Sequence, residues 1–269
     1  MNAEAPSSPA LLEPPERPRS FWFLAGLSAL ALLLLAGFIA LGNWQMARRT
    51  WKLDLISRVE GRVNAPPAVP PGPAEWPGLT AAGAEYRALQ VTGRFLPGQD
   101  TLVDANTQRG PGHWVMSPLL SEQGFILMVN RGFAGGERGS ETGPPGPVPE
   151  GVVRFTGLLR WDEPGGALWR PNEPGAGRWY SRDVAALARA RKLGPQPVAP
   201  YFVDARPAPG LPSPPVAGMT PLDFPNNHLV YAITWYGLAL MVVGGMGVVG
   251  RHEWKLRQEQ GRQDIPRPE

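Results

Sequence analysis

The runs FWFLAGLSALALLLLAGFIALG (residues 21–42) and LVYAITWYGLALMVVGGMGVVG (residues 229–250) decide the fold class of this sequence. Each run is 22 residues long and contains no charged side chain. About 20 apolar residues span the hydrocarbon core of a bilayer as an α-helix. The first run is too long for the apolar part of a signal peptide, and no cleavage site follows it. The sequence therefore predicts two transmembrane helices.

Basic residues around the second run predict its orientation. Three of them follow the run at residues 251–257, whereas residues 207–228 before it contain no lysine or arginine. Because cytoplasmic flanks are enriched in such residues, the C-terminus is predicted to be cytoplasmic, and two spans return the N-terminus to the same side. The flanks of the first run do not fit this orientation, since basic residues follow it at 48–52. The second run decides the prediction, because its basic residues lie on one side only. The predicted organisation is a disordered cytoplasmic N-tail (1–20), a transmembrane helix (21–42), an extracytoplasmic domain (43–228), a second transmembrane helix (229–250) and a cytoplasmic C-tail (251–269).

Composition narrows the possible functions. The chain has no cysteine, which excludes disulfides, thiolate nucleophiles and cysteine-ligated zinc or iron–sulfur centres. Its net charge of +3 is small, and no basic run alternates with aromatics, so no nucleic-acid binding is predicted. The common hydrolase, nucleotide-binding and zinc-protease motifs are missing from the sequence, which favours binding or assembly over catalysis. Acidic residues in the N-tail argue against a mitochondrial transit peptide, so a bacterial inner membrane is the simpler location.

The region between the two runs is predicted to be rich in β-strands. Strands are expected at 89–95, 101–105, 114–120, 124–133, 152–161 and 200–204, where β-branched and aromatic residues alternate or cluster between turn residues. One helix is expected at residues 181–192, with Ser181 as its N-cap, and the first membrane helix is expected to continue to about residue 62. The fold class is therefore α+β, two transmembrane helices flanking a β-rich domain with one or two helices. The pattern leaves a small sheet and a partial barrel both open.

The two membrane helices are predicted to touch, because they bracket a single domain. Small residues would permit close packing. They occur at four-residue spacing in the first helix (Ala25, Ala29, Ala36, Ala40) and at three-residue spacing in the second (Gly244, Gly247, Gly250).

The segment PNNH at residues 225–228 begins the second apolar run with three polar residues. Asn226 or Asn227 can cap a helix there, and interfacial aromatics follow. His228 has two explanations. It is either an ordinary interface histidine or a metal ligand, since Tyr231 and Trp235 lie at i+3 and i+7 on one helix face and could line a flat macrocycle.

Five segments carry a resemblance to a known family. They are LGNWQMARRTWKLDLI (41–56), GFILMVNRGF (124–133), RWYSRDVAALA (178–188), PYFVDA (200–205) and NNHLVYAITWYGLAL (226–240). In order and spacing the sequence resembles the Surfeit locus protein 1 family of cytochrome c oxidase assembly factors. The family often has glutamate between the asparagine and the histidine, where this chain has Asn227.

The resemblance implies a role in maturing subunit I of haem–copper oxidases, with haem a synthase as a possible further partner. It implies transient binding of haem a, with His228 as an axial ligand to the iron. The haem propionates would then need cations, and Arg48, Arg49 and Arg131 are the candidates. Each arginine also has a simpler explanation, interfacial for the first two and structural for the third.

Three other functions stay open at this point. The first is a scaffold that stabilises a subunit I intermediate without touching haem. The second is a two-span sensor, although the 19 residues after the second run are too few for a signalling domain. The third is an enzyme that modifies haem, for which no second ligand or redox residue is found.

Overall fold

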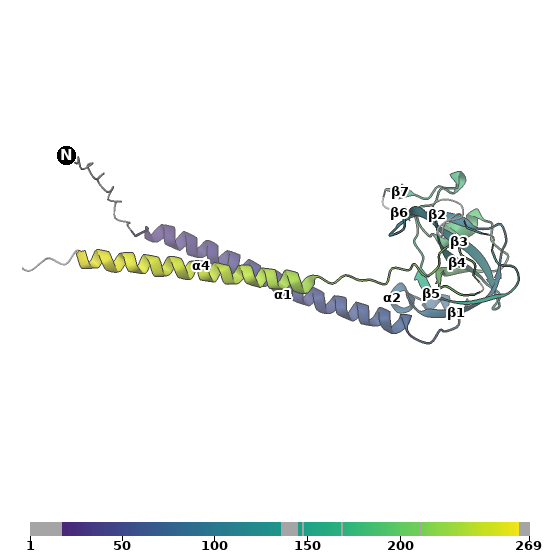
Figure 1. The fold of residues 1–269 in the computed structure, drawn as a ribbon, viewed down its shortest axis with the longest axis horizontal. Coiled ribbons are helices and arrows are strands. Elements are labelled where there is room, and N and C mark those ends of the chain that lie inside the picture. The colour runs from purple at the N-terminus through teal and green to yellow at the C-terminus, as the bar shows by residue number, and fades with distance from the viewer. Residues whose placement is uncertain (1–17, 136–144, 147, 168, 210, 264–269) are drawn as a thin grey trace, which may run out of the picture. The chain divides into compact units, whose positions relative to one another are not determined.

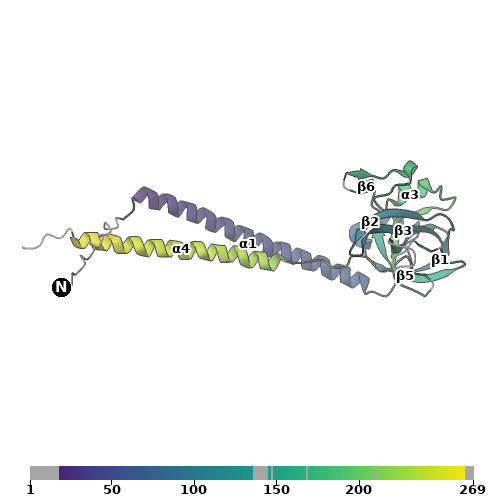
Figure 2. The same ribbon diagram turned by 45° about the horizontal axis from the view of Figure 1, so that its top comes forward.

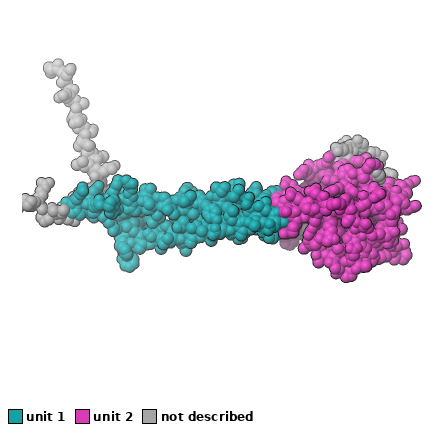
Figure 3. All heavy atoms as spheres, turned by 90° about the horizontal axis from the view of Figure 1, so that it is seen from below, with its two compact units in different colours: residues 1–54, 225–269 teal, residues 55–224 magenta. Residues whose placement is uncertain are grey.

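The computed structural model describes residues 18–135, 145–146, 148–167, 169–209 and 211–263. The chain divides into two compact units, one formed by residues 1–54 and 225–269 and the other by residues 55–224 (Figure 3). The first unit contains helical segments from both ends of the chain, and the second contains every strand. Together they give two helices flanking a β-rich domain, which confirms the predicted α+β class.

Two long helices pass through the first unit. They are α1 (Phe21–Val63) and α4 (His228–Gln263), and both are long and apolar enough to cross a membrane. α1 continues without a break past the apolar run, as its sequence predicts. The helices run side by side in opposite directions (Figures 1 and 2). Their contacts show the same direction, since residues 19, 43 and 45 bond to residues 253, 236 and 228 in that order. Leucines on the other faces remain exposed, which suits a lipid environment.

The contact face of each helix repeats every seven residues. Shielded positions alternate at spacings of four and three, which is the pattern of antiparallel helices packed as in a coiled coil. On α1 these positions are Leu24, Ser28, Ala31, Leu35, Phe38, Gly42, Gln45, Arg49 and Lys52. On α4 they are His228, Ala232, Trp235, Ala239, Val242, Met246, Val249, Glu253 and Leu256.

The predicted glycine contact on α4 is wrong for this helix pair. A Cβ atom added at Gly244, Gly247 or Gly250 would meet no atom within 4 Å. The three glycines fall between the seven-residue contact positions, so they face away from α1. The close approach occurs instead at Gly42 of α1, opposite Tyr236.

The second unit is a small closed barrel. Its strands are β1 (Ala88–Phe95), β2 (Thr101–Thr107), β3 (Gly110–Ser121), β4 (Ile126–Ala134), β5 (Val153–Trp161) and β8 (Val198–Ala205). The order is β1-β5-β8-β4-β3-β2, and an additional pairing of β1 with β3 closes the five strands other than β2. Gly93 lies on this seam, where a Cβ atom would fall 2.3 Å from the carbonyl oxygen of Leu120. Closure therefore requires a residue without a side chain at that position.

The strand predictions are confirmed, each within a few residues. β4 and β8 pair in parallel, and the other pairings of the barrel are antiparallel. The connection from β4 to β8 contains β5 and α3, which is long enough for a parallel crossover. The barrel interior is apolar and includes Leu89, Leu119, Leu127, Phe155 and Tyr201.

Short elements surround the barrel. They are η1 (Trp76–Gly78), α2 (Ala81–Ala84), a hairpin of β6 (Gly166–Ala167) and β7 (Arg170–Pro171), η2 (Pro174–Ala176) and α3 (Val184–Ala190). α3 covers a second apolar cluster outside the barrel that contains Met116, Met128 and Phe202. Its N-cap is Asp183, whose side chain accepts from the Ala186 amide, rather than the predicted Ser181. The Ser181 hydroxyl instead donates to the Glu163 carbonyl, which fixes it outside the helix.

Two proline-rich segments of the second unit, residues 65–77 and 211–217, contact the barrel strands. In the first, Ala68 pairs with Leu89 of β1, and the Tyr201 hydroxyl donates to the carbonyl of Pro71 at 2.8 Å. In the second, Val216 pairs with Phe133 of β4 through two backbone hydrogen bonds. Backbone pairing therefore attaches both segments to the barrel.

Candidate functional site

The segments NWQ of α1 and HLVYAITWY of α4 form one packed joint within the first unit. Gly42 lies against the ring of Tyr236, and a Cβ atom there would come within 2.6 Å of a ring carbon. The Tyr236 hydroxyl donates to the side-chain oxygen of Asn43 at 2.7 Å. Phe38 stacks on Trp235 with ring centroids 5.8 Å apart. The two segments that carry the strongest resemblance therefore meet each other.

His228 lies at the end of this joint and contacts Gln45. The distance from its Nδ1 to Gln45 Oε1 is 2.8 Å, a good hydrogen-bond length between the two helices. Gln45 is buried and His228 is half-buried. Nε2 of His228 makes no hydrogen bond within the described part of the chain, and it is not enclosed. This nitrogen is free to bind a ligand.

The other predicted residues of this unit lie on the same two helices as Gln45 and His228. Trp235 is half-buried against Phe38, so only one face of its indole is open. Tyr231 is 55% exposed, one turn along α4 from His228. Arg48 and Arg49 follow Gln45 by three and four residues, which places them one helical turn beyond it on the same side of α1. The Arg48 guanidinium also covers the ring of Trp51, 3.9 Å from its centroid.

α4 begins directly after the two asparagines, but the predicted side-chain cap is not confirmed. The carbonyl of Asn227 accepts from the Tyr231 amide at 3.3 Å, the first hydrogen bond of the helix. Side-chain caps from Asn226 or Asn227 are not observed among the described residues. The Oδ1 atom of Asn226 is buried without a hydrogen-bond partner in the described chain. A buried acceptor without a donor costs about 1–3 kcal/mol, so this atom marks a place where a donor would stabilise the site.

Arg131 lies in β4, in the second unit, and only 2% of its side chain is exposed. It pairs with Asp100 at 3.2 Å, donates to the Gly146 carbonyl and lies over the Phe95 ring. Burial lowers its pKa from the ordinary arginine value, and Asp100 opposes that shift. These contacts favour a structural role. The predicted contact of Arg131 with a haem propionate stays a prediction.

The remaining resemblance segments converge on Asp204, the buried carboxylate of PYFVDA. It accepts hydrogen bonds from Asn130 of the NRGF segment and Arg182 of the RWYSRD segment, at 2.8 and 3.4 Å. Arg160 of β5 and Thr220 complete the set, at 3.3 and 2.8 Å. One carboxylate therefore joins β4, β5 and β8 to the loops that carry Arg182 and Thr220.

Two carboxyl groups beside this network have pKa values shifted in opposite directions. Burial alone would raise the pKa of Glu163, but its hydrogen bonds and charge pairing with Arg182 outweigh burial, so the pKa is lowered. The pKa of Asp162 is raised, chiefly by burial, although the Val184 amide donates to it. Both residues hold the segment that leads into α3.

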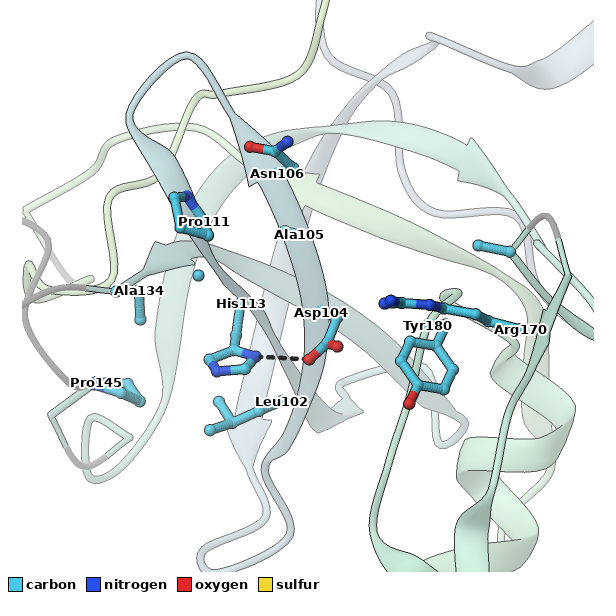
Figure 4. A pocket seen from close by; sticks show the side chains of 13 residues that line it. Leu102, Asp104, Ala105, Asn106, Pro111, His113, Ala134, Pro145, Arg170 and Tyr180 are labelled. Carbon is cyan, nitrogen blue, oxygen red and sulfur yellow. Dashed lines mark ion pairs between the residues drawn. The ribbon is translucent and has the colours of Figure 1, made fainter.

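A groove of about 710 Å³ lies on the second unit, between the β2–β3 ribbon and the β6–β7 hairpin (Figure 4). His113 and Asp104 are cross-strand neighbours on the β2–β3 wall, with Nδ1 and Oδ1 3.2 Å apart. The geometry of this pair is too poor for a hydrogen bond, since Nδ1 remains without a hydrogen-bond partner. Arg170 stacks over Tyr180 on the other wall. The described residues that line the groove include no serine, threonine or lysine.

The described residues contain no group of three or more His, Asp or Glu side chains that could hold a metal ion by themselves. A single histidine suits a different case, an iron already held by a macrocycle, which needs only axial ligands from the protein. His228 is a reasonable candidate for that ligand. Gln45 was missed in the sequence, since nothing in its neighbourhood along the chain shows that it will face a residue 183 positions away.

Comparisons with known proteins identify the family of the chain. The family model described as "SURF1 family" matches residues 32–240. The chain is 34% identical to Surfeit locus protein 1 of Homo sapiens over 229 residues, which cover 77% of this chain and 72% of that protein. It is 32% identical to Surfeit locus protein 1 of Xenopus tropicalis, with 78% and 71% covered. A SURF1-like protein of Caenorhabditis elegans is 28% identical over 235 residues, with 80% and 71% covered. The matched region includes both faces of the His228 joint and the Asp204 network, and the chain belongs to the SURF1 family.

Proposed function

We propose that this protein is an assembly factor for a haem–copper terminal oxidase, cytochrome c oxidase, and not an enzyme. In this proposal it binds haem a transiently through His228 and assists insertion of the haem into subunit I. The observation that supports the proposal is the His228 side chain, held through Nδ1 by Gln45 with Nε2 free, in a chain of the SURF1 family.

The residues around His228 fit a lipid-tailed haem. The free Nε2 would be the axial ligand to the iron. The Phe38–Trp235 stack and Tyr231 offer an aromatic wall beside the histidine. Arg48 and Arg49, one turn beyond Gln45, would meet the propionates through charge-assisted hydrogen bonds. The exposed apolar faces of both helices suit the isoprenoid tail.

Haem a would supply the oxidase with a redox-active iron, and in this protein the side chains would only hold and release it. One imidazole ligand, one exposed arginine (Arg48) and one half-buried arginine (Arg49) make a site that can exchange its ligand. A carrier needs such exchange, because the haem must leave for subunit I.

The location and partners form part of the proposal. The two span-capable helices fit a membrane protein. We place it in the bacterial inner membrane, with the β-rich domain periplasmic and both termini cytoplasmic, because basic residues follow α4's apolar run and none precedes it in residues 207–228. Subunit I is the expected partner and haem a synthase a possible one, and no nucleic acid is expected.

The test is an absorption spectrum with pigment extraction. The full protein is purified in mild detergent from cells that make haem a, beside His228→Ala and the control His252→Ala, which removes a second histidine from the same helix. The expected result is haem a near one per chain in the parent and the control, and its loss from His228→Ala. Equal haem in all three would remove His228 from the site.

The alternative is a scaffold that stabilises a subunit I intermediate without touching haem. Family membership supports it as well, since both readings require the same partner. It predicts no haem on the parent protein and unchanged recovery of subunit I with His228→Ala. The same preparations therefore decide between the two.

A further inference from the structure

The hydrogen bond between Gln45 and His228 determines which ring nitrogen can bind a ligand. We infer that Gln45 is a positioning residue that holds His228 in the tautomer protonated on Nδ1, which leaves the lone pair on Nε2. The identity of the ligand, haem iron, rests on the proposed function. The tautomer is a property of the protein without haem and can be measured separately.

The chemistry of the contact fixes the proton. Gln45 faces the imidazole with its amide oxygen, Oε1, at 2.8 Å from Nδ1. An amide oxygen can only accept a hydrogen bond, so Nδ1 must donate. A neutral imidazole carries one proton, and Nε2 is then unprotonated. The contact therefore selects the form of His228 that can coordinate a metal.

Burial keeps the amide in place. Gln45 occupies a contact position of α1, with only 9% of the residue exposed. The neighbouring contact position, Gly42, is pressed against Tyr236 of the same α4 segment that carries His228. A buried amide without a partner is destabilising, so Gln45 cannot turn from His228 without loss of stability.

The antiparallel packing of α1 and α4 brings Gln45 next to His228. His228 is the first residue of α4, and Gln45 lies beyond the apolar run of α1. The joint of Gly42, Asn43 and Tyr236 sets the register of the two helices at this level. In metal sites, the nitrogen of a histidine that does not bind the metal is usually held by a hydrogen-bond partner. Loss of that partner typically weakens metal binding 10- to 100-fold.

The first test is the ¹⁵N NMR spectrum of the full-length, haem-free protein in detergent, labelled on histidine, at a pH where imidazole is neutral. The chain has three histidines, and His228→Ala assigns the signal of interest. We expect wild-type His228 to be protonated on Nδ1. In Gln45→Leu the proton should redistribute toward Nε2, whereas Gln45→Glu keeps an acceptor and should retain the wild-type tautomer. Gln258→Leu, an exposed substitution of the same type on α4, should change nothing.

The wild-type spectrum alone can overturn the inference, even if Gln45→Leu does not fold. A wild-type His228 protonated on Nε2 would show that Gln45 does not set the tautomer. An unchanged tautomer in a folded Gln45→Leu would show the same.

The second test is titration with haem a extracted from purified oxidase. We expect Gln45→Leu to weaken binding 10- to 100-fold, and Gln45→Glu to remain within a few-fold of wild type. If wild type binds no haem, the proposed function fails, and the NMR result still decides the role of Gln45. If His228-dependent binding is intact while Gln45→Leu binds equally well, the proposed function stands and the positioning role is wrong.

Discussion

Asp204 shows how strongly the second unit depends on one residue. Its carboxylate is 5% exposed and accepts four hydrogen bonds, two of them from arginines whose side chains are 11% exposed. A buried ion pair adds little net stability when complete, but removal of one partner leaves a charge without compensation. The network is therefore more sensitive to loss of its carboxylate than its distances alone suggest.

We expect Asp204→Ala to destabilise the second unit by about 3–5 kcal/mol, since Arg160 and Arg182 would both lose their shared acceptor. For a unit of this size the midpoint of thermal unfolding should fall by on the order of 10 °C. The measurement is tryptophan fluorescence of the full protein in detergent on heating. Asp223→Ala, at an exposed position of the same type, is the control. Equal midpoints for the two variants would contradict the central role of Asp204.

Glu163 gives the unit a dependence on pH. Its pKa is lowered, because pairing with Arg182 outweighs the effect of burial. The carboxylate therefore stabilises the fold fully above the unfolded glutamate pKa of about 4.3, and this contribution is lost as the pH falls through the lower folded value. Glu163 is 38% exposed, so we expect the contribution to be below about 1 kcal/mol.

The corresponding test compares wild type with Glu163→Gln by urea unfolding at pH 6.5 and pH 3.5. Wild type should be the more stable at pH 6.5, and the difference should shrink at pH 3.5. Glu150→Gln, an exposed glutamate, should show no such convergence. A constant difference at both pH values would mean that the Glu163 carboxylate does not supply it.

Sequence reasoning reaches some of these residues and not others. His228 could be identified because a histidine directly before an uncharged apolar run is unusual locally, and the resemblance supports it. Gln45, Asn43 and Asp204 carry no such local signal. Their roles depend on partners 183, 193 and up to 74 residues away, which only the folded chain brings together.

At the level of elements, the two helices pack differently from the sequence expectation. Small residues at regular spacing suggested glycine contacts on α4, but the shielded positions follow a seven-residue repeat that contains large, polar and charged residues as well. Hydropathy alone could not reveal this repeat, because within the apolar runs the contact face and the lipid face are both apolar. Gly42 is the small residue that the joint requires.

We therefore expect opposite effects from two glycine substitutions in α1. Gly42→Ala would place Cβ 2.6 Å from the Tyr236 ring, displace that ring and weaken its bond to Asn43, at a cost of about 1–3 kcal/mol. Gly37→Ala meets no atom within 4 Å and should stabilise the helix by about 0.5–1 kcal/mol. Thermal unfolding by circular dichroism in detergent measures both. Destabilisation of similar size by the two variants would show that Gly42 is not a special contact.

The strands were easier to predict than their arrangement. Each of the six long strands has a local signal in alternating or clustered β-formers, and each lies close to its predicted range. Closure of the barrel has no local signal. It depends on the pairing of β1 with β3 and on Gly93, whose missing side chain matters only once Leu120 is opposite. The short β6–β7 hairpin and α2 were missed because two- and four-residue elements contain too few positions for any period.

At the scale of the whole molecule, the helix pair bears on topology. α1 and α4 run antiparallel in the first unit. Arg19, just before α1, donates its backbone amide to Glu253 in the C-terminal half of α4. Two antiparallel spans place both tails on one side of a membrane. The basic residues at 251–257 then predict that this side is cytoplasmic, and that residues 48–52 are the exception to the charge rule.

The absence of cysteine from the chain makes this topology directly testable. Single substitutions Gln258→Cys in α4 and Glu122→Cys in the second unit, both at exposed positions, report the two sides. In spheroplasts a membrane-impermeant maleimide should label Glu122→Cys at once and Gln258→Cys only after permeabilisation, and Ser8→Cys in the N-tail should behave like Gln258→Cys. Labelling of Ser8→Cys without permeabilisation, with Gln258→Cys still protected, would place the tails on opposite sides. That result is incompatible with two antiparallel spans, so the proposed haem site, which needs both helices in one bilayer with His228 against Gln45, would have to be abandoned together with the topology.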